Sequence, residues 1–417
     1  MTTWSNLLEM TRRGLRAARL EAYRVRREQT GQVDPDAPAG AELGSRVPGG
    51  AEVLLYFADG PDNLYQIRQW LPVLERLHGV HRVAVLCRKS ASAEVLAAET
   101  ELPVIMLWMF RELESFYEAV GGKVCLYVNA HHLNFQSLTF PDLLHVHLNH
   151  GESDKISMAS NQAKAYDYVL VAGAAAVERY RLNLLRYDGS NLLPVGRPQL
   201  DLVPAHHPST AGQPTVLYAP TWEGGRAQMD YSSVATMGEA IVERLIEGGC
   251  RVVYRPHPKT GATEQVVRAA HERIVSLIEA VGPPHRVSMD EPLGEAFAEA
   301  DVLVADVSSV VLDFLPTGRP FFVTHPPGRP GALLATGSRS DAVGYPLKVE
   351  QLPGLVDELD EVIADDPRRD ERLALAERFF GDTTPGVSTR RFLDAIDAIV
   401  TERDELLTEK RARLGTG

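Results

Sequence analysis

The sequence predicts an α/β protein built from two doubly wound domains in tandem. From residue 51 onward, short apolar runs of strand length alternate with stretches of helix length, a pattern typical of a parallel sheet wrapped by helices. A proline-rich stretch over 195–214 interrupts this alternation, which then resumes and continues to residue 324. Because such a stretch marks a domain boundary, each round of alternation is predicted to form its own sheet.

The first round contains seven apolar runs that are short enough to be strands. Amphipathic stretches of helix length, such as 63–77 and 174–185, lie between many of them and are predicted as helices. The predicted strands are 52–58, 82–87, 103–106, 123–129, 143–148, 168–171 and 192–195.

The second round begins directly after the proline-rich stretch. Three amphipathic stretches, 233–248, 262–281 and 308–317, are predicted as helices. The predicted strands between and around them are 215–218, 251–254, 285–288, 301–305 and 320–324.

The composition is that of a folded protein with an acidic body. The chain has 417 residues, of which 44% are hydrophobic, enough for ordinary cores in two or three domains. Its formal net charge of −13 argues against a protein that coats nucleic acid, because such coating needs clustered Lys and Arg. The predicted organisation is a basic helical arm over 1–30, a linker over 31–50, an N-terminal domain over 51–196, a C-terminal domain over 214–380 and a helical segment over 381–417.

The first 30 residues carry the opposite charge from the rest. They hold seven arginines against three glutamates, a net charge of +4. Apolar side chains recur near helical spacing between the arginines, so an amphipathic basic helix is predicted. Such a helix can bind an anionic membrane surface or pack on the body or on a partner, and both interpretations stay open. The apolar positions are Trp4, Leu8, Leu15, Ala18 and Ala22.

Other features of the sequence point to the cytoplasm, with peripheral binding to the inner face of the cell membrane as an added possibility. Cys87, Cys125 and Cys250 lie far apart, so neither a disulfide framework nor a CxxC metal site is expected. The longest apolar runs, 102–110 and 168–177, are well short of the roughly 20 residues that span a bilayer. The N-terminus shows no signal peptide.

Polar residues that directly follow predicted strands are the candidates for chemistry, because ligands bind outside the carboxyl ends of parallel strands. His150-Gly151 is the first such segment, and a histidine there can act as a general base. A structural histidine is the competing interpretation. His145 and His147 suggest a metal site together with His150, but no acidic or cysteine ligand completes a known spacing.

Two further segments suit a bound anion. Thr221, with the glycines that follow it, offers a hydroxyl and a close backbone approach for a phosphate. Arg255, His257 and Lys259 are held by intervening prolines after a strand, which is typical of an anion clamp. An ordinary strand-to-loop transition and a solvated basic loop are the respective alternatives.

The last segment combines a strand end with a helix start. A buried strand is predicted to end at Asp306, and Ser308 and Ser309 open a helix whose free N–H groups suit a phosphate. Asp313 lies farther along that helix, where a carboxylate can reach ribose hydroxyls. A serine N-cap and a surface aspartate are the alternative.

Taken in order, these segments resemble the CDP-glycerol glycerophosphotransferases that polymerise or prime teichoic acids. The resemblance covers about residues 145–395. The motifs that carry it are His150-Gly151, Tyr218-Ala-Pro-Thr-Trp222, Arg255-Pro-His257-Pro258, Asp306-Val-Ser-Ser309, Gly318-Arg-Pro320 and the late run over 380–391.

The resemblance implies a GT-B arrangement of two Rossmann-like domains, in which the C-terminal domain holds the nucleotide. It implies transfer of glycerol phosphate from CDP-glycerol, or a related polyol phosphate from another CDP-polyol, to a lipid-linked or polymer acceptor, with release of CMP and without a metal or other cofactor. His150 matches the proposed base and His257 a contact of the donor phosphates. The remaining matches on the donor side are Thr221, Arg255, Ser308, Ser309 and, for the ribose, Asp313.

Two segments depart from the family pattern. The loop formed by Gly151, Glu152 and the following residues to Lys155 lacks the family's usual threonine-proline-leucine-lysine run, and this loop is expected to border the acceptor. The Gly- and Pro-rich stretch 325–345 is expected to be a lid or an insertion. A nucleotide-sugar glycosyltransferase or epimerase on the same scaffold, and a non-catalytic membrane-surface scaffold, stay open as alternatives.

Overall fold

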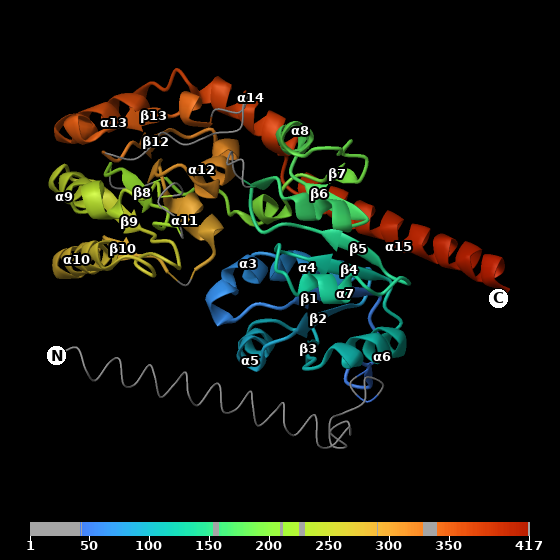
Figure 1. Cartoon of the computed structure of the whole chain (residues 1–417). Helices are drawn as coiled ribbons and strands as arrows, with labels where there is room; N and C mark the ends of the chain where they lie inside the picture. The colour runs from blue at the N-terminus through green and yellow to red at the C-terminus, as the bar shows by residue number, and fades with distance from the viewer. Residues whose placement is uncertain are drawn as a thin grey trace, which may run out of the picture.

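The computed structural model describes residues 42, 44–152, 158–208, 212–224, 230–289, 291–327 and 340–415. The predicted arm over 1–30, the linker residues 31–41 and 43, and Lys155 lie outside these residues. The described chain forms two parallel sheets, each covered by helices on both faces (Figure 1). Within the described ranges, no helix is both long enough and apolar enough to cross a membrane.

The first sheet has seven parallel strands in the order β3-β2-β1-β4-β5-β6-β7. The chain runs outward from β1 to β3 and then returns to the other side of β1 with β4, so the strand order reverses between β1 and β4. All positions of β1, β2 and β4 are buried, as expected for strands covered on both faces. The strands are β1 Val53–Phe57, β2 Val83–Cys87, β3 Val104–Met106, β4 Val124–Tyr127, β5 Leu144–His147, β6 Tyr168–Val171 and β7 Leu192–Pro194.

The helices of this half are short. The single helix predicted over 63–77 is in fact three pieces, η1, α3 and α4, and Pro72 in the first turn of α4 explains the last break. The helical elements are η1 Pro61–Asn63, α3 Tyr65–Arg68, α4 Leu71–His78, α5 Ser90–Glu99, α6 Phe110–Val120, α7 Asn134–Ser137, η3 Asn161–Ala165, α8 Ala174–Asn183 and η4 Pro198–Leu202.

The second sheet repeats this plan with six parallel strands in the order β10-β9-β8-β11-β12-β13. Its strand order reverses between β8 and β11. The strands are β8 Thr215–Ala219, β9 Arg251–Tyr254, β10 Arg286–Val287, β11 Val302–Ala305, β12 Phe321–Thr324 and β13 Tyr345–Leu347. The helical elements are η6 Val234–Gly238, α9 Glu239–Glu247, α10 Gln265–Val281, α11 Leu293–Glu299, α12 Ser309–Phe314, η7 Leu315–Thr317, η8 Ser340–Val343, η9 Val349–Gly354, α13 Leu355–Ala364, α14 Arg369–Phe380 and α15 Val387–Leu414.

The two halves are joined by the last helix as well as by the chain between β7 and β8. Helix α15 leaves the C-terminal half and runs across the first sheet (Figure 1). There Phe392, Ile396 and Ile399 enter the core formed by β1, β2 and α4. Phe392 packs on Trp70 with their ring centroids 5.4 Å apart.

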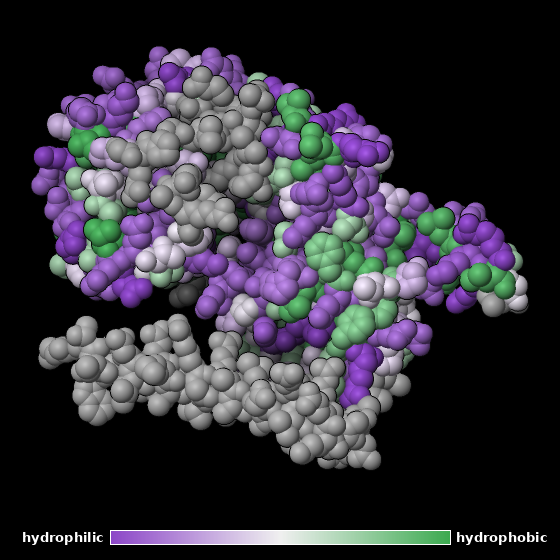
Figure 2. Space-filling model, in the orientation of Figure 1, coloured by the Kyte–Doolittle hydropathy of each residue, from purple (hydrophilic) through white to green (hydrophobic). Residues whose placement is uncertain are grey.

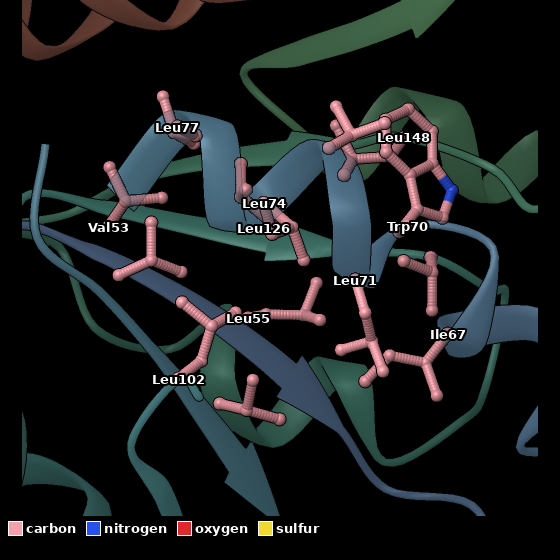
Figure 3. Close-up of a cluster of buried hydrophobic side chains, with 14 of the residues drawn as sticks. Val53, Leu55, Ile67, Trp70, Leu71, Leu74, Leu77, Leu102, Leu126 and Leu148 are labelled. Atoms are coloured by element: carbon pink, nitrogen blue, oxygen red, sulfur yellow. The ribbon is translucent and has the colours of Figure 1, made fainter. Parts of the chain in front are cut away.

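Trp70 belongs to a dense apolar cluster beneath the loop that carries His150. Leu71, Leu74 and Leu77 of α4 pack against Leu55 of β1 in this cluster (Figure 3). Apolar side chains gather inside, and most of the coloured surface in Figure 2 is hydrophilic.

The predicted fold class is confirmed, since both rounds of alternation form parallel doubly wound sheets. The strand β13 was missed, because Tyr345–Leu347 lies at the end of the Gly- and Pro-rich stretch expected to be a lid or an insertion. It pairs in parallel with β12 and extends the sheet by one strand. The middle of that stretch, 328–339, lies outside the described residues.

Candidate functional site

The candidate site lies where the carboxyl ends of the two sheets meet. In each sheet the strand order reverses, and the crevice at that reversal faces this place. Parallel α/β sheets bind ligands in such crevices. Two close approaches show that the halves touch here. A Cβ added to Gly151 would lie 3.7 Å from Cβ of Ser309, and the rings of Tyr65 and His257 have centroids 5.5 Å apart.

The loop that carries His150 is held by hydrogen bonds to its own backbone. Asn149 adopts a left-handed conformation with φ of 61°, which turns the chain sharply after β5. Its side-chain Oδ1 accepts a hydrogen bond from the N–H of His150 at 2.9 Å, and its carbonyl accepts one from Trp70 Nε1 at 2.7 Å. His150 then lies edge-on to the ring of Tyr65, with 6.1 Å between centroids.

The imidazole of His150 is neutral at ordinary pH. Burial lowers its pKa to about 4, and the positive charges of Arg197 and Lys259 act in the same direction. The carbonyl of Val128 accepts a hydrogen bond from the ring, whereas the buried Nδ1 has no hydrogen-bond partner among the described residues. The buried Nδ1 therefore has a lone pair that can accept a proton.

His257 presents the opposite chemistry. Its Nδ1 accepts a hydrogen bond from the N–H of Lys259 at 3.1 Å, so a neutral ring carries its hydrogen on Nε2. Trp222 stacks on the same ring, with centroids 6.0 Å apart and planes inclined by 19°. The ammonium of Lys259 lies over two rings, 5.6 Å from the centroid of Trp222 and 5.9 Å from that of Tyr65.

A buried carboxylate fixes the Trp222 loop to the His257 loop. Glu223 accepts hydrogen bonds from the N–H groups of Gly261 at 3.0 Å, Thr263 at 2.8 Å and Glu264 at 3.2 Å, at the start of α10. Burial acts to raise the pKa of Glu223, but these N–H groups outweigh it and the pKa is lowered. Glu223 therefore stays ionised and ties the two loops together.

Arg255 has different partners from His257 and Lys259, the other two candidate residues of its segment. Its two terminal nitrogens donate hydrogen bonds to Oγ of Ser288 and to the carbonyl of Glu291, both at 2.8 Å. These partners lie between β10 and α11. The expected anion clamp is thus divided, with His257 and Lys259 at the domain interface and Arg255 held against the loop after β10.

The helix start at Ser308 and Ser309 retains unused hydrogen-bonding capacity within the described part of the chain. Ser308 is the N-cap of α12 and makes no capping hydrogen bond with its side chain. Its buried Oγ has no hydrogen-bond partner among the described residues. Ser309 is the residue that Gly151 approaches.

Below these serines, Asp306 joins the ends of three strands. It is fully buried and accepts hydrogen bonds from the N–H groups of Thr221 at 2.8 Å and Ser233 at 3.2 Å and from the hydroxyl of Thr324. Burial outweighs these hydrogen bonds and raises the pKa of Asp306 to about 6. The predicted phosphate ligand Thr221 is therefore buried and has its N–H committed to Asp306.

The proposed ribose-binding acid, Asp313, has both oxygens engaged. Arg197 donates to them from Nε at 2.6 Å and from Nη2 at 3.0 Å. Arg197 follows β7, and it also donates to Gln69 at 2.9 Å. The pair is buried and links the first half to α12, so no oxygen of Asp313 faces an open ribose position in this structure.

The acceptor loop is described only in part. Glu152 is buried and forms an ion pair with Arg179 of α8, which is also buried. A cavity of about 30 Å³ borders this loop, lined by Asn149, Gly151 and Arg197 among others. Gly151 lies at the interface with Ser309, and Lys155 lies outside the described residues.

His145 and His147 belong to the core of the first half. His145 contacts the hydroxyl of Tyr127 at 2.9 Å and the carbonyl of Phe140 at 3.0 Å. Burial lowers the pKa of His147 to about 4. Within the described part of the chain, no three His, Cys, Asp or Glu side chains converge as metal ligands.

Tyr65 and Arg197 were not among the residues predicted for the site, although both border it. Tyr65 lies in a four-residue helix rather than directly after a strand, so its position along the chain carried no signal. Arg197 follows β7 and could have been found by the rule that residues after parallel strands line the site.

The fold, two parallel α/β sheets with helices on both faces, is that of the GT-B class. The chain belongs to the CDP-glycerol:poly(glycerophosphate) glycerophosphotransferase family, whose model matches residues 127–397. The predicted family is thereby confirmed, and the protein is a CDP-glycerol glycerophosphotransferase-like transferase. A comparison with curated protein sequences yields no match.

Solved structures with the same fold include a teichoic acid polymerase and sugar-nucleotide epimerase-like proteins. The wall teichoic acid polymerase TagF, in a variant soaked with CDPG, is 14% identical, with a TM-score of 0.55 over 88% of this chain and 94% of TagF. A UDP-N-acetylglucosamine 2-epimerase homologue from Listeria monocytogenes is 15% identical, with a TM-score of 0.52 over 85% and 97% of the two chains. S. aureus MnaA, solved with UDP, is 14% identical, with a TM-score of 0.52 over 84% and 97%.

Proposed function

We propose that this protein transfers glycerol phosphate, or a related polyol phosphate, from a CDP-activated donor to an acceptor hydroxyl and releases CMP. The acceptor is a lipid-linked or polymeric substrate of a teichoic-acid-like pathway. One observation carries the proposal: a histidine with a bare nitrogen and a histidine with an N–H contact the same tyrosine ring from opposite halves of the molecule.

His150 acts as the base in this proposal. The acceptor hydroxyl gives its proton to Nδ1 as its oxygen attacks the β-phosphorus of the donor. The bond between that phosphorus and the oxygen of CMP breaks, and CMP leaves with the electron pair. The pKa of His150 is about 4 without donor, and the negative charge of a bound pyrophosphate would raise it toward the range of an effective base.

Positive and hydrogen-bonding groups from the C-terminal half receive the donor phosphates. The N–H on Nε2 of His257 donates a hydrogen bond to the phosphoryl oxygens, and the ammonium of Lys259 neutralises part of their charge. The free N–H groups of the helix start and the unpaired hydroxyl of Ser308 add donors on the side of α12. No acidic metal cluster is required by this arrangement.

Membrane association belongs to the same proposal. The basic arm over 1–30 binds the anionic inner face of the membrane and brings the site to a lipid-linked acceptor. Sedimentation with vesicles of phosphatidylglycerol tests this, with the chain lacking residues 1–30 as the control. Equal sedimentation of both chains contradicts a membrane role for the arm.

Donor screening tests the reaction itself. The purified chain is incubated with a glycerol phosphate primer and with CDP-glycerol, CDP-ribitol, UDP-N-acetylglucosamine or GDP-mannose, and the released nucleotide and the extended primer are measured. We expect CMP and a primer longer by one polyol phosphate from a CDP-polyol only. Turnover of a UDP- or GDP-sugar alone would instead support the glycosyltransferase or epimerase alternative, and donor binding without turnover would support a scaffold.

A further inference from the structure

Tyr65 occupies the centre of the site although it lies far from every motif of the sequence. It belongs to the four-residue helix α3 of the first half. Its ring is edge-on to His150 at 6.1 Å and to His257 at 5.5 Å. Among the ring contacts of the described residues, only those of Tyr65 reach both histidines, so it bridges the base and the donor-binding side.

A chain of hydrogen-bonded side chains, Gln66, Asn129 and Asp59, supports Tyr65. Its hydroxyl accepts a hydrogen bond from Nε2 of Gln66 at 3.2 Å. Oε1 of Gln66 in turn accepts from Nδ2 of Asn129 at 2.8 Å, and the same Nδ2 donates to Asp59 at 2.7 Å. Gln66 and Asn129 are buried, and Asp59 and Asn129 follow the two strands between which the strand order reverses.

A residue proposed to bind the donor, Lys259, also contacts this ring. The ammonium of Lys259 lies 5.9 Å from the centroid of Tyr65 and is shared with Trp222. Burial raises the pKa of Tyr65, so the phenol stays neutral. A neutral, amphipathic ring between two polar catalytic groups excludes water from the space it fills without competing for their protons.

We propose that Tyr65 is a positioning residue that makes the site choose an alcohol over water. This inference rests on the proposed function. The ring keeps His150 and His257 apart at a fixed spacing and fills the space through which water would reach the donor phosphorus. Only an acceptor that binds beside the ring then brings a hydroxyl to His150.

Water would react by the same step as the acceptor. Its oxygen attacks the β-phosphorus, its proton passes to His150, and the bond to CMP breaks, which gives free polyol phosphate and CMP. Truncation of Tyr65 to alanine removes a whole phenol ring. Because one water takes about 30 Å³ of liquid volume, that space admits water next to the base.

The number of CMP molecules released per acceptor molecule extended measures the choice between alcohol and water. We expect a ratio near one for the wild type and a rise of about tenfold or more for Tyr65→Ala, together with free polyol phosphate. Tyr65→Phe loses the hydrogen bond from Gln66 but keeps the ring and its contacts with His150, His257 and Lys259, so its ratio should stay near one. Phe110→Ala is the matched control, because it truncates a half-exposed aromatic residue of the same half that stacks on Phe140.

A role of Tyr65 in packing alone would lower both products equally and leave the ratio unchanged, and that result overturns the inference. If Tyr65→Ala does not fold, Tyr65→Leu replaces it, because leucine keeps part of the bulk. For Tyr65→Leu, a ratio between those of the wild type and the expected tenfold rise supports the inference, and a ratio of one contradicts it. The ratio is taken with whichever activated donor the wild type uses. A wild type that ignores CDP-polyols but uses another donor therefore overturns the proposed function alone, and a wild type without any turnover overturns both.

Discussion

At the scale of single residues, the environment of each histidine decides which role its ring can take. His150 has a buried Nδ1 without a hydrogen-bond partner among the described residues, and burial with nearby positive charge lowers its pKa to about 4. His257 has its Nδ1 occupied by a backbone N–H, which leaves an N–H on the other nitrogen. One ring is thus suited to accept a proton and the other to bind an anion.

Replacement of the histidines should separate these roles. We expect His150→Ala to lower kcat by about 10²–10⁴-fold, the usual contribution of a general base, with the Kd for the donor nearly unchanged. His257→Ala should lower kcat and also weaken donor binding. CMP release and calorimetric titration measure the two effects, with the exposed His207→Ala as the control. A rate near that of the wild type for His150→Ala contradicts its role.

Asp306 predicts an unusual pH dependence of stability. Its folded pKa of about 6 lies above the ordinary value of 3.8, so the folded chain holds this proton more tightly than the unfolded chain. The stabilisation is complete below pH 3.8 and is lost as the pH rises through about 6. Asp306→Asn has no such proton, so its free energy of unfolding should fall less than that of the wild type between pH 4.5 and 7. Equal changes in urea titrations at the two pH values contradict this account.

At the scale of elements, short loops after parallel strands are held by buried charged groups rather than by regular secondary structure. Glu223 joins the loop after β8 to the start of α10. Arg197, after β7, joins the first half to Asp313 of α12. These connections hold the residues of the candidate site in place because each one satisfies several backbone or side-chain donors at once.

Loss of the Glu223 carboxylate should damage both stability and binding. Glu223→Ala leaves the N–H groups of Gly261, Thr263 and Glu264 without their acceptor, and we expect a loss of about 2–4 kcal/mol in the free energy of unfolding. Donor affinity should fall as well, because Trp222 and His257 lose their common support. Urea unfolding and calorimetry measure the two effects. Glu223→Gln keeps one acceptor oxygen and should recover part of both; no recovery would indicate that the charge alone matters.

Removal of the Arg197–Asp313 pair should shift the pH profile. Burial is the main cause of the low pKa of His150, and the charge of Arg197 is the next. In the double variant Arg197→Gln/Asp313→Asn that positive charge is gone, so the pKa of His150 should rise. We expect the acidic limb of the profile of kcat/KM to move to higher pH. The double variant avoids an unpaired buried charge, and an unmoved limb contradicts the influence of Arg197 on His150.

At the scale of the whole molecule, α15 fastens the two halves together. It begins after the C-terminal sheet is complete, packs along the N-terminal sheet and projects beyond it (Figure 1). Its apolar face supplies part of the N-terminal core. A transferase with its site between two domains gains a fixed frame from such a connection, because the carboxyl ends of the sheets must face each other.

Truncation of the anchor of α15 should therefore destabilise the N-terminal half. Phe392 is fully buried, and we expect Phe392→Ala to cost about 3–5 kcal/mol in the free energy of unfolding. Leu406 lies on the same helix and is 43% exposed, so Leu406→Ala should change stability by less than about 0.5 kcal/mol. Urea unfolding measures both, and equal effects would contradict the role of Phe392 as the anchor.

Much of the fold could be predicted because its signals are local. Most strands of both sheets are short apolar runs, and helices such as α9 and α10 are stretches of helical period between them. The strand β13 could not be found this way, because its three residues follow a Gly- and Pro-rich stretch and are stabilised only by pairing with β12. The break between α3 and α4 likewise depends on Pro72 and on packing beneath the His150 loop.

The sequence by itself determined the fold class, the family and the motif residues, because period, strand ends and the order of motifs are properties of neighbouring residues. Only the tertiary structure decided which of these residues share one site. It brought His150, His257 and Lys259 around Tyr65, turned Arg255 toward Ser288 and engaged Asp313 with Arg197. The reason is physical. Some of these contacts join residues more than a hundred positions apart, and the strength of each contact depends on how deeply its groups are buried and which charges surround them. Those surroundings exist only once both sheets have folded.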